Sequence, residues 1–191
     1  MQENKTIGFA LTGSYCTFQK VFPQVQILVD AGYRVIPIFS ENAASTNTRF
    51  GNANDHIKKL EDITGQSAIC TIEKAEPFGP KKVLDLLMIA PCTGNTIAKL
   101  ATGIADSTVT LAAKSHLRNG RPLVIAISTN DGLGGNAQNI GKLLARKHFF
   151  FVPFGQDDCI EKENSLVADF SQIPETVSLA LTGKQIQPLL C

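Results

Sequence analysis

The sequence lacks an excess of either charge. Its 191 residues include eighteen Lys and Arg against seventeen Asp and Glu, and no stretch gathers the basic residues into a stripe. Nucleic acids and anionic membrane surfaces attract proteins through such a stripe or through a large net charge. The composition therefore disfavours a nucleic-acid partner.

Long apolar runs are also lacking. A membrane-spanning helix needs about 20 consecutive apolar residues, and the run after the polar start MQENKT is too short for a signal peptide. We therefore expect no membrane association and a cytoplasmic protein. The length and a hydrophobic content of 43% fit one domain over 1–191, in which 165–191 form a C-terminal helix and tail.

Familiar arrangements of metal-binding and nucleophilic residues are missing. The five Cys form no C-x-x-C, the three His form no H-x-x-x-H, and no G-x-S-x-G occurs. A disulfide framework, a metal site and a hydrolase elbow are therefore not indicated. We expect His56 on an exposed helix face. Cys92 is either a reactive thiol beside a ligand or a small buried side chain.

What the sequence contains is an alternation of apolar and helical segments. Short apolar runs rich in β-branched residues are separated by segments of helical periodicity. Runs such as PLVIAIS are apolar on both faces, as in strands covered from both sides. The pattern predicts a three-layer, Rossmann-like α/β fold whose parallel sheet has about six strands and helices on both faces. The expected strands are 7–11, 34–39, 67–71, 83–90, 122–128 and 148–153.

Polar loops follow the first two expected strands. Gly13 permits a tight turn, and Ser14 can cap the following helix, so the turn is either an anion site or an ordinary capped connection. Ser40 opens the second loop, whose small polar residues are typical either of a ligand edge or of loops in general.

The third polar loop, PCTGNT, ends a strongly apolar run. It offers hydroxyls, an amide and a Gly that admits a ligand, a set that suits the edge of a flat heteroaromatic ring. A helix cap would explain one such residue but not readily four. The residues concerned are Pro91, Thr93, Gly94, Asn95 and Thr96.

A fourth loop contains Gly132-x-Gly134-x-x-Ala137 between a strand and a helix. This spacing formally matches a dinucleotide fingerprint, which would make the protein a stand-alone NAD(P)-dependent dehydrogenase. The loop is longer than a pyrophosphate turn, and Asp131 would stand near the phosphates. The fingerprint is therefore the weakest of the candidate motifs.

With these loops in order, residues 6–155 resemble the flavoprotein family of homo-oligomeric flavin-containing cysteine decarboxylases. TGSYCTFQK matches the family's first loop, and PCTGNTIAKLATGIADS matches its P-A-S-A-N-T followed by a helix and A-D-N/S. The resemblance implies FMN and a trimer-based homo-oligomer. Gly13, Ser14 and Ser40 would meet the phosphate, and 91–96 the isoalloxazine and substrate, with Asn95 as the candidate catalytic residue. Asp106 and Ser107 would reach the cofactor across an oligomer contact.

Two departures from the family pattern argue against cysteine decarboxylation. The catalytic His expected before PCTGNT is absent from EKAEPFGPKKVLDLL, and STNDGLGGNAQN replaces the family's substrate clamp. Within the family, the whole sequence is similar to members that act with a nicotinamide-binding subunit, carrying NAD(P), to make pyridine-2,6-dicarboxylate in sporulating bacteria. Asn130, Gly134 and Gly135 would then help to bind the small dicarboxylate substrate. The alternative is a non-catalytic subunit that has lost flavin.

Overall fold

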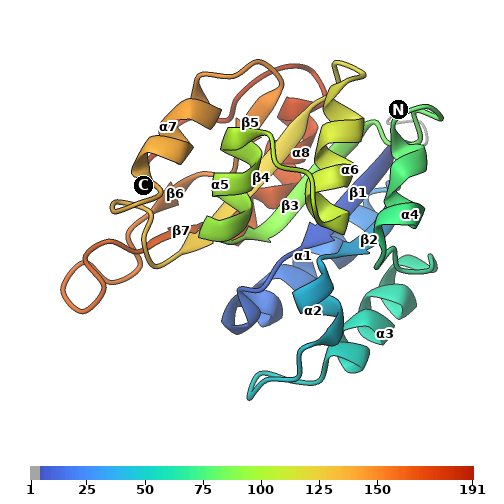
Figure 1. Cartoon of the computed structure of the whole chain (residues 1–191), viewed down its shortest axis with the longest axis horizontal. Coiled ribbons are helices and arrows are strands. Elements are labelled where there is room, and N and C mark those ends of the chain that lie inside the picture. Colours follow the sequence, from blue (N-terminus) through green and yellow to red (C-terminus); the bar gives the residue numbers. More distant parts are fainter. Residues whose placement is uncertain (1–4) are drawn as a thin grey trace.

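Seven strands form one sheet at the centre of the structure (Figure 1). The computed structural model describes residues 5–191. The strands are β1 (Thr6–Leu11), β2 (Arg34–Phe39), β3 (Leu86–Cys92), β4 (Leu123–Thr129), β5 (Phe149–Phe151), β6 (Phe154–Gly155) and β7 (Leu166–Ala168). β1 and β3 are buried along their whole lengths, which explains why their sequences are apolar on both faces.

Five of these strands are parallel, in the order β2-β1-β3-β4-β5. β7 pairs antiparallel with the carboxyl end of β4 through Ser128 and Thr129, and β6 pairs antiparallel with β7. The predicted α/β class with a mostly parallel sheet is confirmed. The antiparallel corner was not predicted.

Helices cover both faces of the sheet (Figure 1). α1 and α8 contact each other and pack on one face, and α5 and α6 pack on the other, where α7 contacts α5. The helices are α1 (Phe18–Asp30), α2 (Glu41–Ser45), α3 (Ala53–Thr64), α4 (Ile72–Ala75), α5 (Gly94–Thr102), α6 (Thr108–Leu117), α7 (Ala137–Leu144) and α8 (Ile173–Ala180), with 3₁₀ turns η1 (Tyr15–Thr17), η2 (Glu76–Phe78) and η3 (Phe170–Gln172). Within residues 5–191, no helix combines the length and apolar character needed to cross a membrane.

Two expected elements differ from the structure. Residues 67–71 form no strand, and only Ile69 bridges to β2. Ile69 bonds to the Pro37 carbonyl and the Phe39 amide, and Pro37 has no N–H that could extend the pairing towards residue 67. The segment 165–191 begins with β7 and not with a helix. Its first residues, Leu166 to Ala168, alternate buried with half-buried side chains, which is a strand pattern too short to recognise.

Candidate functional site

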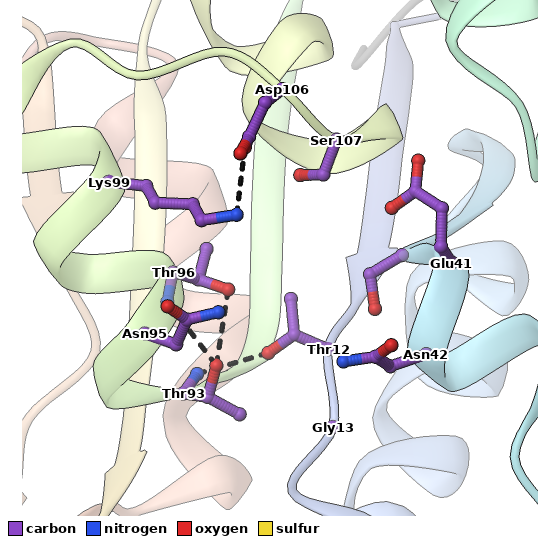
Figure 2. A pocket seen from close by; sticks show the side chains of 11 residues that line it. Thr12, Gly13, Glu41, Asn42, Thr93, Asn95, Thr96, Lys99, Asp106 and Ser107 are labelled. Carbon is purple, nitrogen blue, oxygen red and sulfur yellow. Dashed lines mark hydrogen bonds and ion pairs between the residues drawn. The ribbon is translucent and has the colours of Figure 1, made fainter.

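The strand order reverses at β1, because β2 and β3 lie on its two sides. In open α/β sheets, ligands bind outside the carboxyl ends of the strands at such a reversal. A cavity of about 400 Å³ lies there, enclosed by the loops after β1, β2 and β3 and by the start of α6 (Figure 2). We call it the first cavity. Its lining residues are Thr12, Gly13, Ser40, Glu41, Asn42, Thr93, Asn95, Thr96, Lys99, Asp106 and Ser107.

Thr12 fixes the two central loops to each other. Its Oγ1 donates to the Pro91 carbonyl over 2.8 Å and accepts from the Thr93 amide over 3.0 Å. The side chain is 1% exposed, so both bonds are shielded from water. Pro91 itself lines neither this cavity nor the second cavity, which is described below. Its place in the site is thus structural, through the carbonyl that Thr12 holds.

Several hydroxyls at the rim cap helices. The Ser40 and Thr93 Oγ atoms accept from backbone amides at the starts of α2 and α5, and Ser107 forms a capping box with Thr110 at the start of α6. The capping alternative is therefore correct for Thr93, whereas Ser14 makes no capping bond, and the caps by Ser40 and Ser107 were not predicted. A hydroxyl that accepts one amide bond still has its own hydrogen to donate. Capping and ligand binding are compatible here.

The side-chain amides of Asn42 and Asn95 point to the first cavity from opposite sides (Figure 2). Neither amide has a hydrogen-bond partner in the described part of the chain, although the Asn42 carbonyl of the backbone accepts from the Tyr15 hydroxyl over 2.8 Å. Each amide presents two donors and an acceptor. They are the uncommitted polar groups of this cavity.

Charges in the first cavity are held by neighbours. Glu41 Oε1 accepts from both the amide and the hydroxyl of Thr108, each over 2.8 Å. Lys99 and Asp106 form an ion pair of 2.8 Å, and the hydrogen bond from Lys99 is the main cause that lowers the pKa of Asp106. Two carboxylates thus face one ammonium. Sequence reasoning missed Glu41 and Lys99, although Lys99 lies one turn after Asn95 and so on the same side of α5.

A second cavity of about 560 Å³ adjoins the first, with which it shares Gly13 and Thr93. It extends towards the antiparallel corner and includes Ser14, Gly94 and Asn130. The structure therefore divides most of the predicted site residues between two cavities. Gly13, Ser40, Thr93, Asn95, Thr96, Asp106 and Ser107 surround the first within one chain.

Gly94 does not owe its missing side chain to a ligand. A Cβ placed there would lie 2.6 Å from Asn136 Nδ2, 2.6 Å from Thr129 Oγ1 and 2.7 Å from Asp131 Oδ1. These three side chains are bonded together, since Thr129 and Asn136 donate to Asp131 over 2.5 and 2.8 Å. The loop after β4 thus fills the space where the family motif has Ala, while Gly94 itself lines the second cavity.

The same loop also corrects the expected substrate contacts. Gly134 and Gly135 line neither cavity, and the Gly134 amide already donates to the Asp131 carbonyl over 3.0 Å. The Asp131 carboxylate is held by Asn136, the residue just before α7. A negative charge there disfavours the pyrophosphate of a dinucleotide. The geometry thus argues against the stand-alone dehydrogenase.

The remaining candidate side chains are structural. His56 is 5% exposed and packs between Phe18 and Phe22, with ring centroids 5.0 and 5.7 Å away, so the expectation of an exposed His56 is wrong. Cys92 is fully buried, which raises its thiol pKa far above the usual value. Of the two alternatives for Cys92, the structure supports the small buried side chain, which is inert. No group of three His, Cys, Asp or Glu side chains among residues 5–191 is placed to hold a metal ion.

Comparison with known proteins decides the family. The profile of the family described as Flavoprotein matches residues 1–181. The chain belongs to the flavoprotein family. The B subunit of dipicolinate synthase from Bacillus subtilis (strain 168) is 52% identical over 188 residues, which cover 98% of this chain and 94% of that protein. The bifunctional coenzyme A biosynthesis protein CoaBC of Borreliella burgdorferi is 29% identical over 161 residues, 80% of this chain and 38% of that protein.

Solved flavoprotein structures support the same assignment. The crystal structure of the B subunit of dipicolinate synthase from Bacillus halodurans is 48% identical, with a TM-score of 0.90, and the match covers 98% of this chain and 96% of that one. The FMN-dependent cysteine decarboxylase SpaF is 19% identical over 94% of this chain and 96% of that one, with a TM-score of 0.65. At that identity the likeness shows the fold alone.

Proposed function

We propose that this chain is the B subunit of a dipicolinate synthase. Acting with a nicotinamide-binding A subunit, it helps to form dipicolinate from dihydrodipicolinate in the cytoplasm of the mother cell during sporulation. The observation that carries the proposal is the 52% identity to a protein of that name over 98% of the chain. The two joined cavities give the chain room for a cofactor and a small dicarboxylate.

The first cavity fits the uncharged parts of FMN. The amides of Asn42 and Asn95 are uncommitted, and the Ser40 hydroxyl keeps a hydrogen to donate. These groups match the ribityl hydroxyls and the polar edge of the isoalloxazine ring. Glu41 and Asp106 disfavour a phosphate beside them, so we place the phosphate at the Gly13 turn. Ser14, whose hydroxyl bonds to Ser128 in the second cavity, and Ser40, which lies next to Glu41, are then not its main partners.

Dihydropyridine aromatisation removes two electrons and two protons from the ring. When bound, FMN would supply an acceptor for both electrons, as would NAD(P) on the A subunit. The chain's own groups orient the substrate. Asn95, which lines the first cavity two residues after the shared Thr93, is the candidate catalytic residue. Thr12 holds the loop after β1 against the end of β3 through its two buried hydrogen bonds.

A second candidate function is a scaffold without flavin. It is favoured by the closed cluster of Thr129, Asp131 and Asn136 against Gly94, because that cluster fills part of the family's flavin-facing motif. On this alternative, the chain binds substrate or the A subunit, and the nicotinamide takes the electrons.

We also propose a homo-oligomer. Relatives of the same fold are described as a dodecameric decarboxylase and as a cubic protein cage. Asp106 and Ser107 line the cavity within their own chain, so the site does not need a neighbouring copy to supply them.

Reconstitution tests the function. The purified chain is incubated with FMN, separated from free cofactor, and its visible spectrum is recorded. It is then combined with the A subunit, NAD(P) and dihydrodipicolinate, and dipicolinate is measured by its ultraviolet absorbance. Product that requires both chains supports the proposed function, and a co-eluting flavin band distinguishes the flavin form from the scaffold. A complex that forms no product in excess of the A subunit alone would refute the proposal.

A further inference from the structure

The second cavity has a polar wall that contains a pair of bonded hydroxyls. Ser14 Oγ and Ser128 Oγ lie 2.6 Å apart, and Ser128 is only 5% exposed. Two hydroxyls bring two hydrogens, and a bond between them uses one. The other hydrogen is free for an acceptor in the cavity. Because Ser128 is buried and Ser14 is half-buried, a ligand oxygen that accepts this hydrogen would replace water at a partly desolvated pair.

Two ammonium groups line the same cavity from different elements. Lys20 comes from α1, and Lys162 comes from the loop between β6 and β7. Among residues 5–191, Lys20 forms no ion pair, and Lys162 pairs with Asp157 over 3.3 Å. Two positive charges therefore face one carboxylate. In the first cavity the balance is reversed, so anions are favoured in the second.

The Lys162–Asp157 pair leaves the ammonium available. Its side chains are 54% and 33% exposed, and ion pairs this open to water contribute little to stability. Asp157 does not depend on Lys162 for its charge, since a hydrogen bond from Ser165 is the largest cause that lowers its pKa. A ligand carboxylate can therefore share Lys162 without leaving Asp157 unpaired.

Aromatic side chains give this cavity a flat apolar part. Tyr15 and Phe50 both line it, and the bond from the Tyr15 hydroxyl to the Asn42 carbonyl holds the tyrosine between the two cavities. A planar ring with carboxylates at its edge would meet apolar surface on its faces and donors at its rim.

We propose that the second cavity is the dicarboxylate site, in which Lys162 and Lys20 bind the two carboxylates of a planar pyridine or dihydropyridine ring and the Ser14–Ser128 pair donates to one of them. The assignment of the ring rests on the proposed function. Lys162 is a specificity-determining residue that neither the family motifs nor the first cavity indicates, because it lies on the antiparallel corner.

The test measures binding to the purified full-length chain, with dipicolinate in metal-free buffer as the probe and calorimetry as the readout. Lys162→Gln keeps the polarity and most of the length but removes the charge, and loss of one charge-assisted contact corresponds to a Kd about tenfold or more higher. Lys58→Gln is the matched control, since Lys58 pairs with Asp62 on the exposed face of α3. Pyridine-2,6-dicarboxamide, the uncharged analogue, should not compete.

A second readout follows Cys16, an exposed thiol that also lines the cavity. Dipicolinate should slow the alkylation of Cys16 several-fold, as measured by peptide mass spectrometry. The exposed Cys191, which does not line the cavity, should be unaffected. Equal dipicolinate affinity in the wild-type, Lys162→Gln and Lys58→Gln chains would overturn the proposal, as would protection of Cys16 by FMN but not by dipicolinate.

The two proposals fail separately. If the complex with the A subunit makes dipicolinate while Lys162→Gln leaves both Kd and KM unchanged, the dicarboxylate site is wrong and the proposed function stands. If dipicolinate binding depends on Lys162 but the complex makes no product, the site stands as a dicarboxylate site and the proposed function fails.

Discussion

Substitution of Gly94 by Ala tests whether the loop after β4 is closed against α5. The added methyl would lie 2.6–2.7 Å from three side-chain atoms, whereas Cβ atoms essentially never approach other heavy atoms within 3.0 Å. The loop must therefore move by at least a few tenths of an ångström. Overpacking of this kind costs about 1–3 kcal/mol, and a move that breaks a hydrogen bond to Asp131 adds about 1 kcal/mol.

Part of this cost is offset, because Ala is favoured over Gly in a helix by up to about 1 kcal/mol. We therefore expect the free energy of unfolding to fall by about 1–3 kcal/mol. For a chain of this length, each kcal/mol lowers Tm by about 2–4 °C. The expected loss in Tm is thus roughly 2–12 °C.

The assay is thermal and urea denaturation of matched Gly→Ala variants. Gly141 lies within α7, and a Cβ added there would meet no atom within 4 Å, so Gly141→Ala should be neutral or stabilising by up to about 1 kcal/mol. The double change Gly94→Ala with Asp131→Ala should cost less than the sum of its parts, because removal of the carboxylate makes room. Equal stability of Gly94→Ala and Gly141→Ala would refute the closed loop.

Three further outcomes are expected. Alkylation at pH 8 should modify Cys16 in the native chain but Cys92 only after unfolding, because burial raises the pKa of the Cys92 thiol; peptide mapping checks the order. His116 is fully buried, and burial lowers its pKa to about 4. Since the imidazole takes up a proton more readily in the unfolded chain, the free energy of unfolding should fall as the pH drops from about 6.5 to 4. Relative to neutral pH, the free energy of unfolding at pH 5 should be about 2 kcal/mol lower. Urea denaturation measures this difference, which should be smaller in His116→Gln. Asn95→Ala should weaken FMN binding or raise KM at unchanged Tm, and an effect on neither would count against the first cavity.

Most of the parallel sheet could be predicted from the sequence, because each strand combines a β-branched apolar run with a helix that returns to the next strand. The rim followed from the same pattern, since polar residues directly after strands must gather at one edge. Thr93 and Ser40 illustrate the limit of such reasoning. Their positions were predictable, but a sequence does not separate a capping hydroxyl from one that meets a ligand, because both need the same residue type at the same place.

The second cavity was beyond prediction for a different reason. β6 and β7 have two and three residues, too few to show a periodic pattern, and Lys162 stands far along the chain from the motifs it joins. Only the pairing of β7 with Ser128 and Thr129 brings that loop to the rim. The close packing of the loop after β4 against Gly94 was not predicted, because long-range contacts are not visible in one sequence.

Because of the antiparallel corner, the two cavities are bounded by different kinds of chain segment. The first is enclosed by βα connections of the parallel sheet, where any insertion would disturb a strand or a helix cap. The second is closed partly by the surface loop between β6 and β7, whose length and charge can change while the sheet stays intact. On the proposed assignment, a change in this single loop would alter the substrate site and leave the cofactor rim intact.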